Sequence, residues 1–180
     1  MADQRDGQIF WIRPAERAVI ICEDFHIPRS LQKLRKKNKF RFTTDVAFRA
    51  VVESCADRRE TWICRDIEDL FGQLHGLGFA HSVEAWDPSG KLVGGVYGLS
   101  IGGVFAGESM FHLEPGASKL CIVALVEHLT NLGYGTLDCQ QQTPHMQRFG
   151  ARMISDENYS ALLSSQAAPL EWHAKTFPTD

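Results

Sequence analysis

The stretch from Lys91 to Lys119 limits the possible folds of this chain more than any other part of it. Residues 92–98 and 104–111 are rich in β-branched and aromatic residues but also contain several glycines. A glycine inside a strand removes a packing side chain, so it typically marks a bulge or a close approach by another backbone or a ligand. The pattern predicts an irregular hairpin in which Glu108 is a lone carboxylate among apolar neighbours. A plain hairpin with Glu108 facing solvent fits the same residues.

The apolar periodicity of the remaining chain predicts further strands and helices. Strands are expected at residues 17–22, 40–43, 81–86, 136–140 and 152–154. Helices are expected after Pro28, after an N-cap at Thr44, from Asp66 to Gly76 or Gly78, from Ser118 to Gly133 and over residues 155–163. From residue 80 onward the order is β-β-β-α-β-α-β, which is typical of a mixed α/β fold. We expect a small N-terminal lobe over residues 1–65 and a main domain over residues 66–180.

A block of basic residues interrupts an otherwise acidic chain. The net charge is −3, yet residues 29–41 hold seven of the 19 basic residues and no acidic one, leaving 12 basic against 22 acidic residues elsewhere. Such a block gives an oriented field suited to a polyanion, although a solvated basic helix is the commoner reason for a charge run. The seven residues are Arg29, Lys33, Arg35, Lys36, Lys37, Lys39 and Arg41.

Several classes of protein are not expected. No apolar run reaches the roughly 18 residues of a membrane span, and the N-terminus has no apolar signal region. The five cysteines show no C-x-x-C spacing and the seven histidines no H-x-x-x-H spacing. We therefore expect reduced, mostly buried thiols, no metal and a cytosolic location.

Six ordered motifs are similar to those of the bacterial leucyl/phenylalanyl-tRNA–protein transferases. The central block reads Gly94-Gly95-x-Tyr97-Gly98, then Phe105-x-Gly107-Glu108-Ser109-Met110-Phe111, then Ala117-Ser118-Lys119. The others are Trp11-x-x-Pro14-x-x-Arg17-Ala18-Val19, His26-Ile27-x-Arg29-Ser30, Thr61-Trp62-Ile63, Ala80-His81-Ser82-Val83-Glu84-x-Trp86 and Asp138-Cys139-Gln140. Together they extend over roughly residues 9–163, and their common order is far more specific than any one of them.

The resemblance implies an N-acetyltransferase-like catalytic domain and an aminoacyl transfer that needs no cofactor. Members of that family move Leu or Phe from aminoacyl-tRNA to the N-terminal amine of proteins that begin with Arg or Lys, which marks them for degradation. Two alternatives are an acyl-CoA N-acyltransferase on the same fold and a non-catalytic module that binds tRNA or basic N-termini. The first fits poorly, because residues 115–119 lack the Q/R-x-x-G-x-G/A run of a pyrophosphate loop.

The resemblance also implies which residues serve the acceptor amine. Glu108, Asp138 and Gln140 match family positions with proposed catalytic roles. In a strand, Asp138 and Gln140 lie on one face because side chains alternate. Two carboxylates suit an acceptor that carries an ammonium group and a basic side chain, whereas a glutamine can only orient the amine. A hydrogen-bonded pair at a strand end is the structural alternative for Asp138 and Gln140.

The donor needs an apolar slot for its Leu or Phe side chain. Phe105 matches a family pocket residue, and Val96, Tyr97 and Met110 are further candidates. Trp62 matches a tryptophan near the 3′-terminal adenosine of the tRNA. The basic block would bind the tRNA backbone.

One family segment is not found. Family members usually carry a Gly-Ile-Phe-Pro-Trp-type motif before the W-x-x-P motif, and its tryptophan helps to hold the adenosine. Here only a few residues precede Trp11. We therefore expect a shortened form in which Trp62 is the remaining stacking platform.

Overall fold

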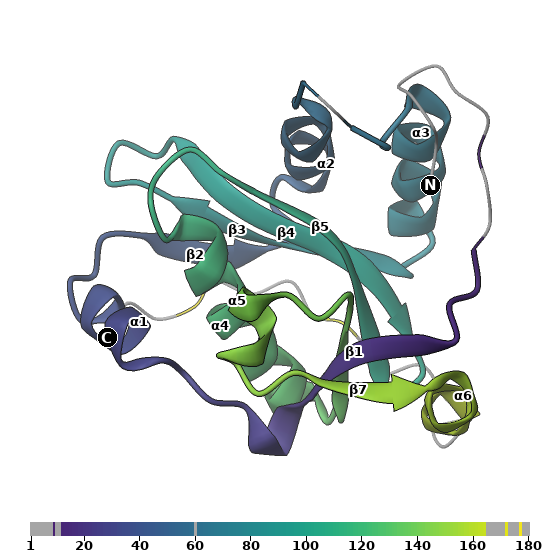
Figure 1. Cartoon of the computed structure of the whole chain (residues 1–180). Helices are drawn as coiled ribbons and strands as arrows, with labels where there is room; N and C mark the ends of the chain where they lie inside the picture. The colour runs from purple at the N-terminus through teal and green to yellow at the C-terminus, as the bar shows by residue number, and fades with distance from the viewer. Residues whose placement is uncertain (1–8, 10–11, 60, 165–171, 173–176, 178–180) are drawn as a thin grey trace.

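One seven-stranded sheet organises the part of the chain that the computed structural model describes, namely residues 9, 12–59, 61–164, 172 and 177 (Figure 1). The strand order is β2-β3-β4-β5-β6-β1-β7. Neighbouring strands are antiparallel except β5 and β6, which are parallel. The strands are β1 (Glu16–Ile21), β2 (Arg41–Thr44), β3 (Ala80–Trp86), β4 (Leu92–Ile101), β5 (Val104–His112), β6 (Thr136–Gln140) and β7 (Arg152–Ser155).

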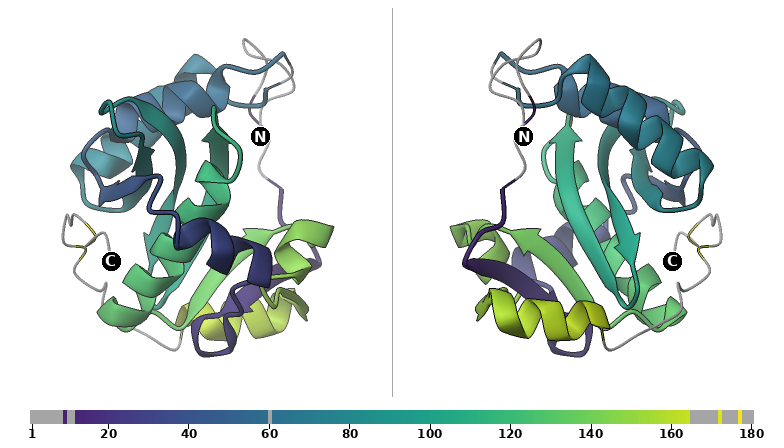
Figure 2. Two further views of the ribbon diagram at one scale, coloured as in Figure 1. Left: turned by 90° about the vertical axis from the view of Figure 1, so that its left-hand side faces the viewer. Right: turned by 90° about the vertical axis from the view of Figure 1, so that its right-hand side faces the viewer.

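Helices cover both faces of the sheet (Figures 1 and 2). The helices α2 and α3 pack on one face of the central strands, where they form a core cluster with Tyr97 and Phe111. The helix α4 packs on the opposite face and supplies the centre of the larger cluster. The helices are α1 (Arg29–Arg35), α2 (Phe48–Ala56), α3 (Arg65–Gly76), α4 (Ala117–Leu132), α5 (Pro144–Gln147) and α6 (Asp156–Ser164).

The mixed α/β class and the predicted order of elements are confirmed, but the helix start at Thr44 is wrong. Thr44 is the last residue of β2 and is fully buried, and α2 begins only at Phe48. The reason is Asp45, which adopts a left-handed backbone with φ of 59°. Its N–H donates to the Ser82 carbonyl (3.2 Å) and its carboxylate accepts from the Ser82 N–H (2.8 Å). These bonds extend the pairing with β3 by one residue and delay the helix.

The boundary predicted at residue 65 runs through this sheet. β1 lies between β6 and β7, and β2 pairs with β3 at the opposite edge. The predicted lobe therefore has no sheet of its own, because its two strands complete the sheet of the predicted main domain. Long-range strand pairing of this kind leaves no local signal in the sequence.

The glycines of β4 permit a bulge in the neighbouring strand and a close approach by its backbone, as the sequence predicts. Tyr97 pairs with Ser109 and Gly98 pairs with Gly107, so Glu108 is the extra residue of a bulge in β5. A Cβ atom at Gly98 would lie 2.2 Å from the Ala106 carbonyl oxygen, which is a forbidden contact. The close approach is therefore made by the protein's own backbone.

The helices within the described ranges are all too short or too polar to cross a membrane. The cysteines are free; Cys22, Cys55, Cys64 and Cys121 are buried, and Cys139 is partly exposed. Their burial agrees with the packing role that the sequence predicts.

Candidate active site

The strands β5 and β6 separate after a short parallel ladder, and a pocket occupies the opening. The ladder extends from the pair Val104–Thr136 to the pair Ala106–Asp138. Beyond it both strands continue, and a pocket of about 880 Å³ lies between them, which is within the range of small-molecule sites. Residues from both faces of the sheet line it, among them Arg58, Trp62, Val96, Met110, Ser118, Lys119, Ile122, Leu125, Leu137 and Met146.

Glu108 stands at the point of separation because of the bulge in β5. One of its carboxylate oxygens (Oε2) accepts a hydrogen bond of 3.2 Å from Nε2 of Gln140, which lies across the opening at the end of β6. Both side chains line the pocket. The pair therefore bridges the two diverging strands with one ionisable group and one neutral amide.

Asp138 lies behind this pair and is fully buried. Its Oδ1 accepts the backbone N–H of Gln140 at 2.7 Å, and its Oδ2 accepts from Arg17 of β1 at 2.9 Å. Gln140 has a φ of 61°, which is unusual for a residue with a side chain, and the bond to Asp138 holds it there. The structure thus brings together the three residues that the sequence predicts, although the Asp138 charge is already paired.

Burial controls the ionisation of this group. Desolvation raises the pKa of Glu108, which the hydrogen bond from Gln140 and the charge of Arg17 partly oppose. Burial also raises the pKa of the neighbouring Cys139 thiol to about 12. That thiol is therefore protonated at neutral pH and is a poor nucleophile, which favours direct transfer over a thioester intermediate.

Apolar side chains form part of the pocket lining, but the lining differs partly from the prediction. Val96 and Met110 line the pocket as expected. Tyr97 points to the opposite face of β4, where it packs edge-on against Phe48 and Phe71. Phe105 is also buried away from the pocket lining, in the larger core cluster. The alternation of a strand does not reveal which face meets a ligand, so sequence alone could not separate these residues.

Aromatic and basic side chains form the rim between α2 and α3. Trp62 is partly buried and lines the pocket, as does Arg58, which donates a hydrogen bond to the Met110 carbonyl. A ring and a guanidinium group at one rim suit a nucleobase followed by a phosphate. The role of Trp62 at the 3′-terminal adenosine stays a prediction.

The basic segment, residues 29–41, packs beside the N-terminus of α4, where Ser118 and Lys119 line the pocket. Leu34 of α1 packs so closely on the α4 N-terminus that a Cβ atom at Gly116 would lie 2.3 Å from it. Two of the seven predicted charges pair with distant acids, Arg35 with Glu127 and Lys39 with Glu114. Arg41 lies over the Trp86 ring at 5.5 Å. Among the basic residues of the segment, those that are exposed and have no acidic partner in the described ranges are Arg29, Lys33, Lys36, Lys37 and Arg41.

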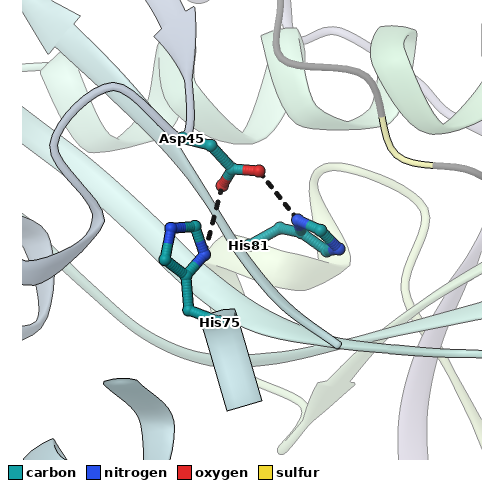
Figure 3. A group of neighbouring side chains, drawn as sticks. All are labelled: Asp45, His75 and His81. Atoms are coloured by element: carbon teal, nitrogen blue, oxygen red, sulfur yellow. Dashed lines mark hydrogen bonds and ion pairs between the residues drawn. The ribbon is translucent and has the colours of Figure 1, made fainter. Parts of the chain in front are cut away.

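A second polar group, outside the pocket, was not predicted from the sequence. Among the described residues, Asp45, His75 and His81 are near enough to share a metal ion (Figure 3). However, Nδ1 of His81 lies 2.8 Å from the Asp45 carboxylate, and Nδ1 of His75 lies 2.8 Å from the Ala80 carbonyl. A metal would have to displace both contacts. The prediction of no metal stays a prediction.

Two residues beside the site were also missed by sequence reasoning. Arg17 contacts Asp138, and its guanidinium lies 4.6 Å from the centre of the Tyr159 ring in α6. Arg17 belongs to one of the ordered motifs, which was the available signal. Tyr159 carries no local signal, because α6 packs on β1 only through the fold.

Comparisons with known proteins identify the family of this chain. The family model for leucyl/phenylalanyl-tRNA protein transferase matches residues 19–164. A protein named leucyl/phenylalanyl-tRNA–protein transferase from Rubrobacter xylanophilus is 46% identical over 158 residues, which is 88% of this chain and 83% of that protein. Its namesake from Herpetosiphon aurantiacus is 46% identical over 159 residues with the same coverage, and that from Novosphingobium aromaticivorans is 44% identical over 174 residues, 94% of this chain and 66% of that protein.

A solved structure shows a similar fold. The structure of L-PGS from Bacillus licheniformis matches with a TM-score of 0.51 at 14% identity, over 69% of this chain and 44% of that one. All of Glu108, Asp138 and Gln140 fall inside the range that the family model matches. The chain therefore belongs to the leucyl/phenylalanyl-tRNA–protein transferase family and is an aminoacyltransferase.

Proposed function

We propose that the protein transfers Leu or Phe, and in some cases Met, from aminoacyl-tRNA to the N-terminal α-amine of proteins that begin with Arg or Lys. Such a transfer would mark the acceptor for degradation. The observation that carries the proposal is the hydrogen-bonded pair of Glu108 and Gln140 at the mouth of an apolar pocket.

The charge of Glu108 determines which acceptor the site suits. Glu108 is a partly buried carboxylate that accepts a hydrogen bond from the neutral amide of Gln140, so a positively charged acceptor is a suitable further partner. Asp138 is less suited, because both of its oxygens are already used. An acceptor with a basic first residue would therefore meet Glu108 rather than two free carboxylates.

The apolar residues of the pocket lining determine which donor side chain the site suits. Five apolar side chains of the pocket lining suit a Leu, Phe or Met side chain and offer no partner for a charged one. They are Val96, Met110, Ile122, Leu125 and Leu137. The 3′-terminal adenosine would lie on Trp62 at the rim. The tRNA backbone would follow the basic segment beside the α4 N-terminus.

The chemistry requires little beyond this placement. The neutral α-amine attacks the ester carbonyl, an amide bond forms, the ester C–O bond breaks, and the ribose hydroxyl leaves with the proton that the amine gives up. The ester is already activated, so holding both substrates together supplies much of the acceleration. Gln140 can orient the amine but is too weak a base to deprotonate it.

A single-turnover assay tests the proposal. Labelled Leu-tRNA is mixed with excess enzyme and a peptide that begins with Arg, and with a matched peptide that begins with Glu. We expect rapid transfer to the first peptide and none to the second. Equal transfer to both would refute the acceptor assignment, and tRNA binding without transfer would refute the reaction.

A further inference from the structure

Arg17 lies on β1, the strand that borders β6 on the side opposite β5. This strand pairs antiparallel with β6 and has a register irregularity between Ala18 and Val19. The irregularity falls where β1 pairs with Asp138 and Gln140. The Arg17 guanidinium donates to the Asp138 Oδ2 at 2.9 Å and packs on the Tyr159 ring. A charged contact and a packing contact therefore fix its position.

Asp138 passes this constraint to the pocket. A fully buried carboxylate without a cation nearby would be strongly unfavourable, so Arg17 allows Asp138 to be charged in the interior. The other oxygen of Asp138 then holds the Gln140 N–H at 2.7 Å and its left-handed backbone. That backbone places the Gln140 amide on Glu108. Arg17 is thus linked to Glu108 by three consecutive hydrogen bonds.

We propose that Arg17 is a positioning residue for the acceptor: by holding Asp138 it fixes the Gln140–Glu108 pair and leaves Glu108 as the carboxylate that meets the acceptor amine. The inference rests on the proposed function of Glu108 and Gln140. Arg17 itself does not line the pocket. Its effect on transfer therefore passes through Asp138.

The test compares Arg17→Met in two backgrounds. Methionine keeps much of the packing on Tyr159 but removes the charge. In the otherwise unchanged protein we expect kcat/KM for an Arg-initiated peptide to fall about 100-fold, which is the order expected when a reacting group is misplaced by about 1 Å. In Asp138→Asn protein, where Oδ1 can still accept the Gln140 N–H, we expect Arg17→Met to change kcat/KM by less than about twofold.

Further measurements separate positioning from general stability. Binding of a 3′-aminoacyl-adenosine analogue should stay within about twofold in Arg17→Met protein, because the donor side is untouched. The acid limb of the pH–rate profile should move to higher pH, since Glu108 loses the positive charge of Arg17, which lowers the pKa of its carboxyl group. The other described groups that interact electrostatically with Glu108 are Asp138 from β6 and the hydroxyls of Tyr97 and Tyr159. A purely structural role would leave this limb in place.

Arg13→Met is the matched control. Arg13 also pairs with an aspartate, Asp156, but the pair is exposed and lies outside the pocket lining. The kcat/KM of Arg13→Met protein should be unchanged.

Two results for Arg17→Met would overturn the proposal. One is a fall in kcat/KM by the same factor in both backgrounds, and the other is an unchanged kcat/KM in the otherwise unchanged protein. If Arg17→Met alone does not fold, kcat/KM is compared between Asp138→Asn protein and the double variant. A change of less than about twofold supports the proposal, and a larger fall overturns it. Glu108→Gln reports on the proposed function separately: no loss there refutes that function, whereas a loss there with none in Arg17→Met refutes only the positioning role.

Discussion

The basic segment should bind the tRNA backbone mainly through its exposed lysines that have no acidic partner. The double change Lys36→Gln and Lys37→Gln removes two charges from the end of α1. Both side chains are exposed, and no described acid pairs with them. Lys39 is different, because it already pairs with Glu114 and would have to leave that partner to reach a phosphate.

The expected size of the effect follows from counterion release. Each phosphate contact contributes about 0.7–0.9 to the slope of log affinity against log salt. Losing two contacts should therefore flatten the slope by about 1.4–1.8 and weaken binding about 25- to 60-fold at roughly 0.1 M salt relative to 1 M. Lys39→Gln should flatten the salt slope by clearly less than the roughly 0.7–0.9 expected for one phosphate contact.

Equilibrium binding of tRNA across a salt series measures this slope. Lys91→Gln is the control, because Lys91 is an exposed lysine in the β3–β4 hairpin, outside the basic segment. It should leave the slope unchanged, and the loss should be similar for all isoacceptors. An unchanged slope in the double variant, or an equal change in Lys91→Gln, would show that the segment faces solvent in the complex.

Four further substitutions test other parts of the structure. Trp62→Ala should weaken binding of a 3′-aminoacyl-adenosine analogue about 5- to 150-fold, since stacking one base on a ring is worth roughly 1–3 kcal/mol; an unchanged Kd would place the adenosine elsewhere. Burial raises the pKa of Glu108, so its neutral form favours the folded state, and that stability is lost as pH rises through the folded pKa. Glu108→Gln should therefore raise the Tm at pH 7 and lose this advantage below the ordinary glutamate pKa of 4.5; a constant difference across pH would contradict this. Gly98→Ala should destabilise the fold by about 1–3 kcal/mol in denaturant unfolding, because its Cβ would strike backbone, whereas Gly72→Ala, with open space around it in a helix, should stabilise by about 0.5–1 kcal/mol; equal effects would refute the packing argument.

The sequence was sufficient where local patterns determine the structure. Apolar spacing identified the long helix that became α4, and the glycines identified the bulge that presents Glu108. It failed at Thr44, because the side chain of Asp45 replaces strand hydrogen bonds and so moves the helix start. A rule based on the residue types that favour N-caps contains no term for such a contact.

The relation between distant segments was the other limit. Nothing near Arg17 indicates that it will pair with a residue 121 positions away. The acids that neutralise Arg35 and Lys39 also come from other elements, so the charge of the basic segment is smaller than a count along the chain suggests. Such pairs exist only once the topology is known.

The insertion of β1 between β6 and β7 has a consequence for the order of assembly. The pairing of β1 with β6 closes a loop of about 120 residues and therefore has a high contact order. Such a pairing forms slowly, because the entropy of loop closure is lost before the new contacts stabilise the structure. During synthesis, β1 must wait for residues 136–155 before it can take its place in the sheet. The helices α2 and α3 with β3–β5 can pack much earlier, so Glu108, Val96 and Met110 can take their places before β6 adds Leu137, Asp138 and Gln140. A nascent chain would thus hold Glu108 in place before Gln140 can reach it, and the link from Arg17 through Asp138 to Gln140 forms only with the last strands.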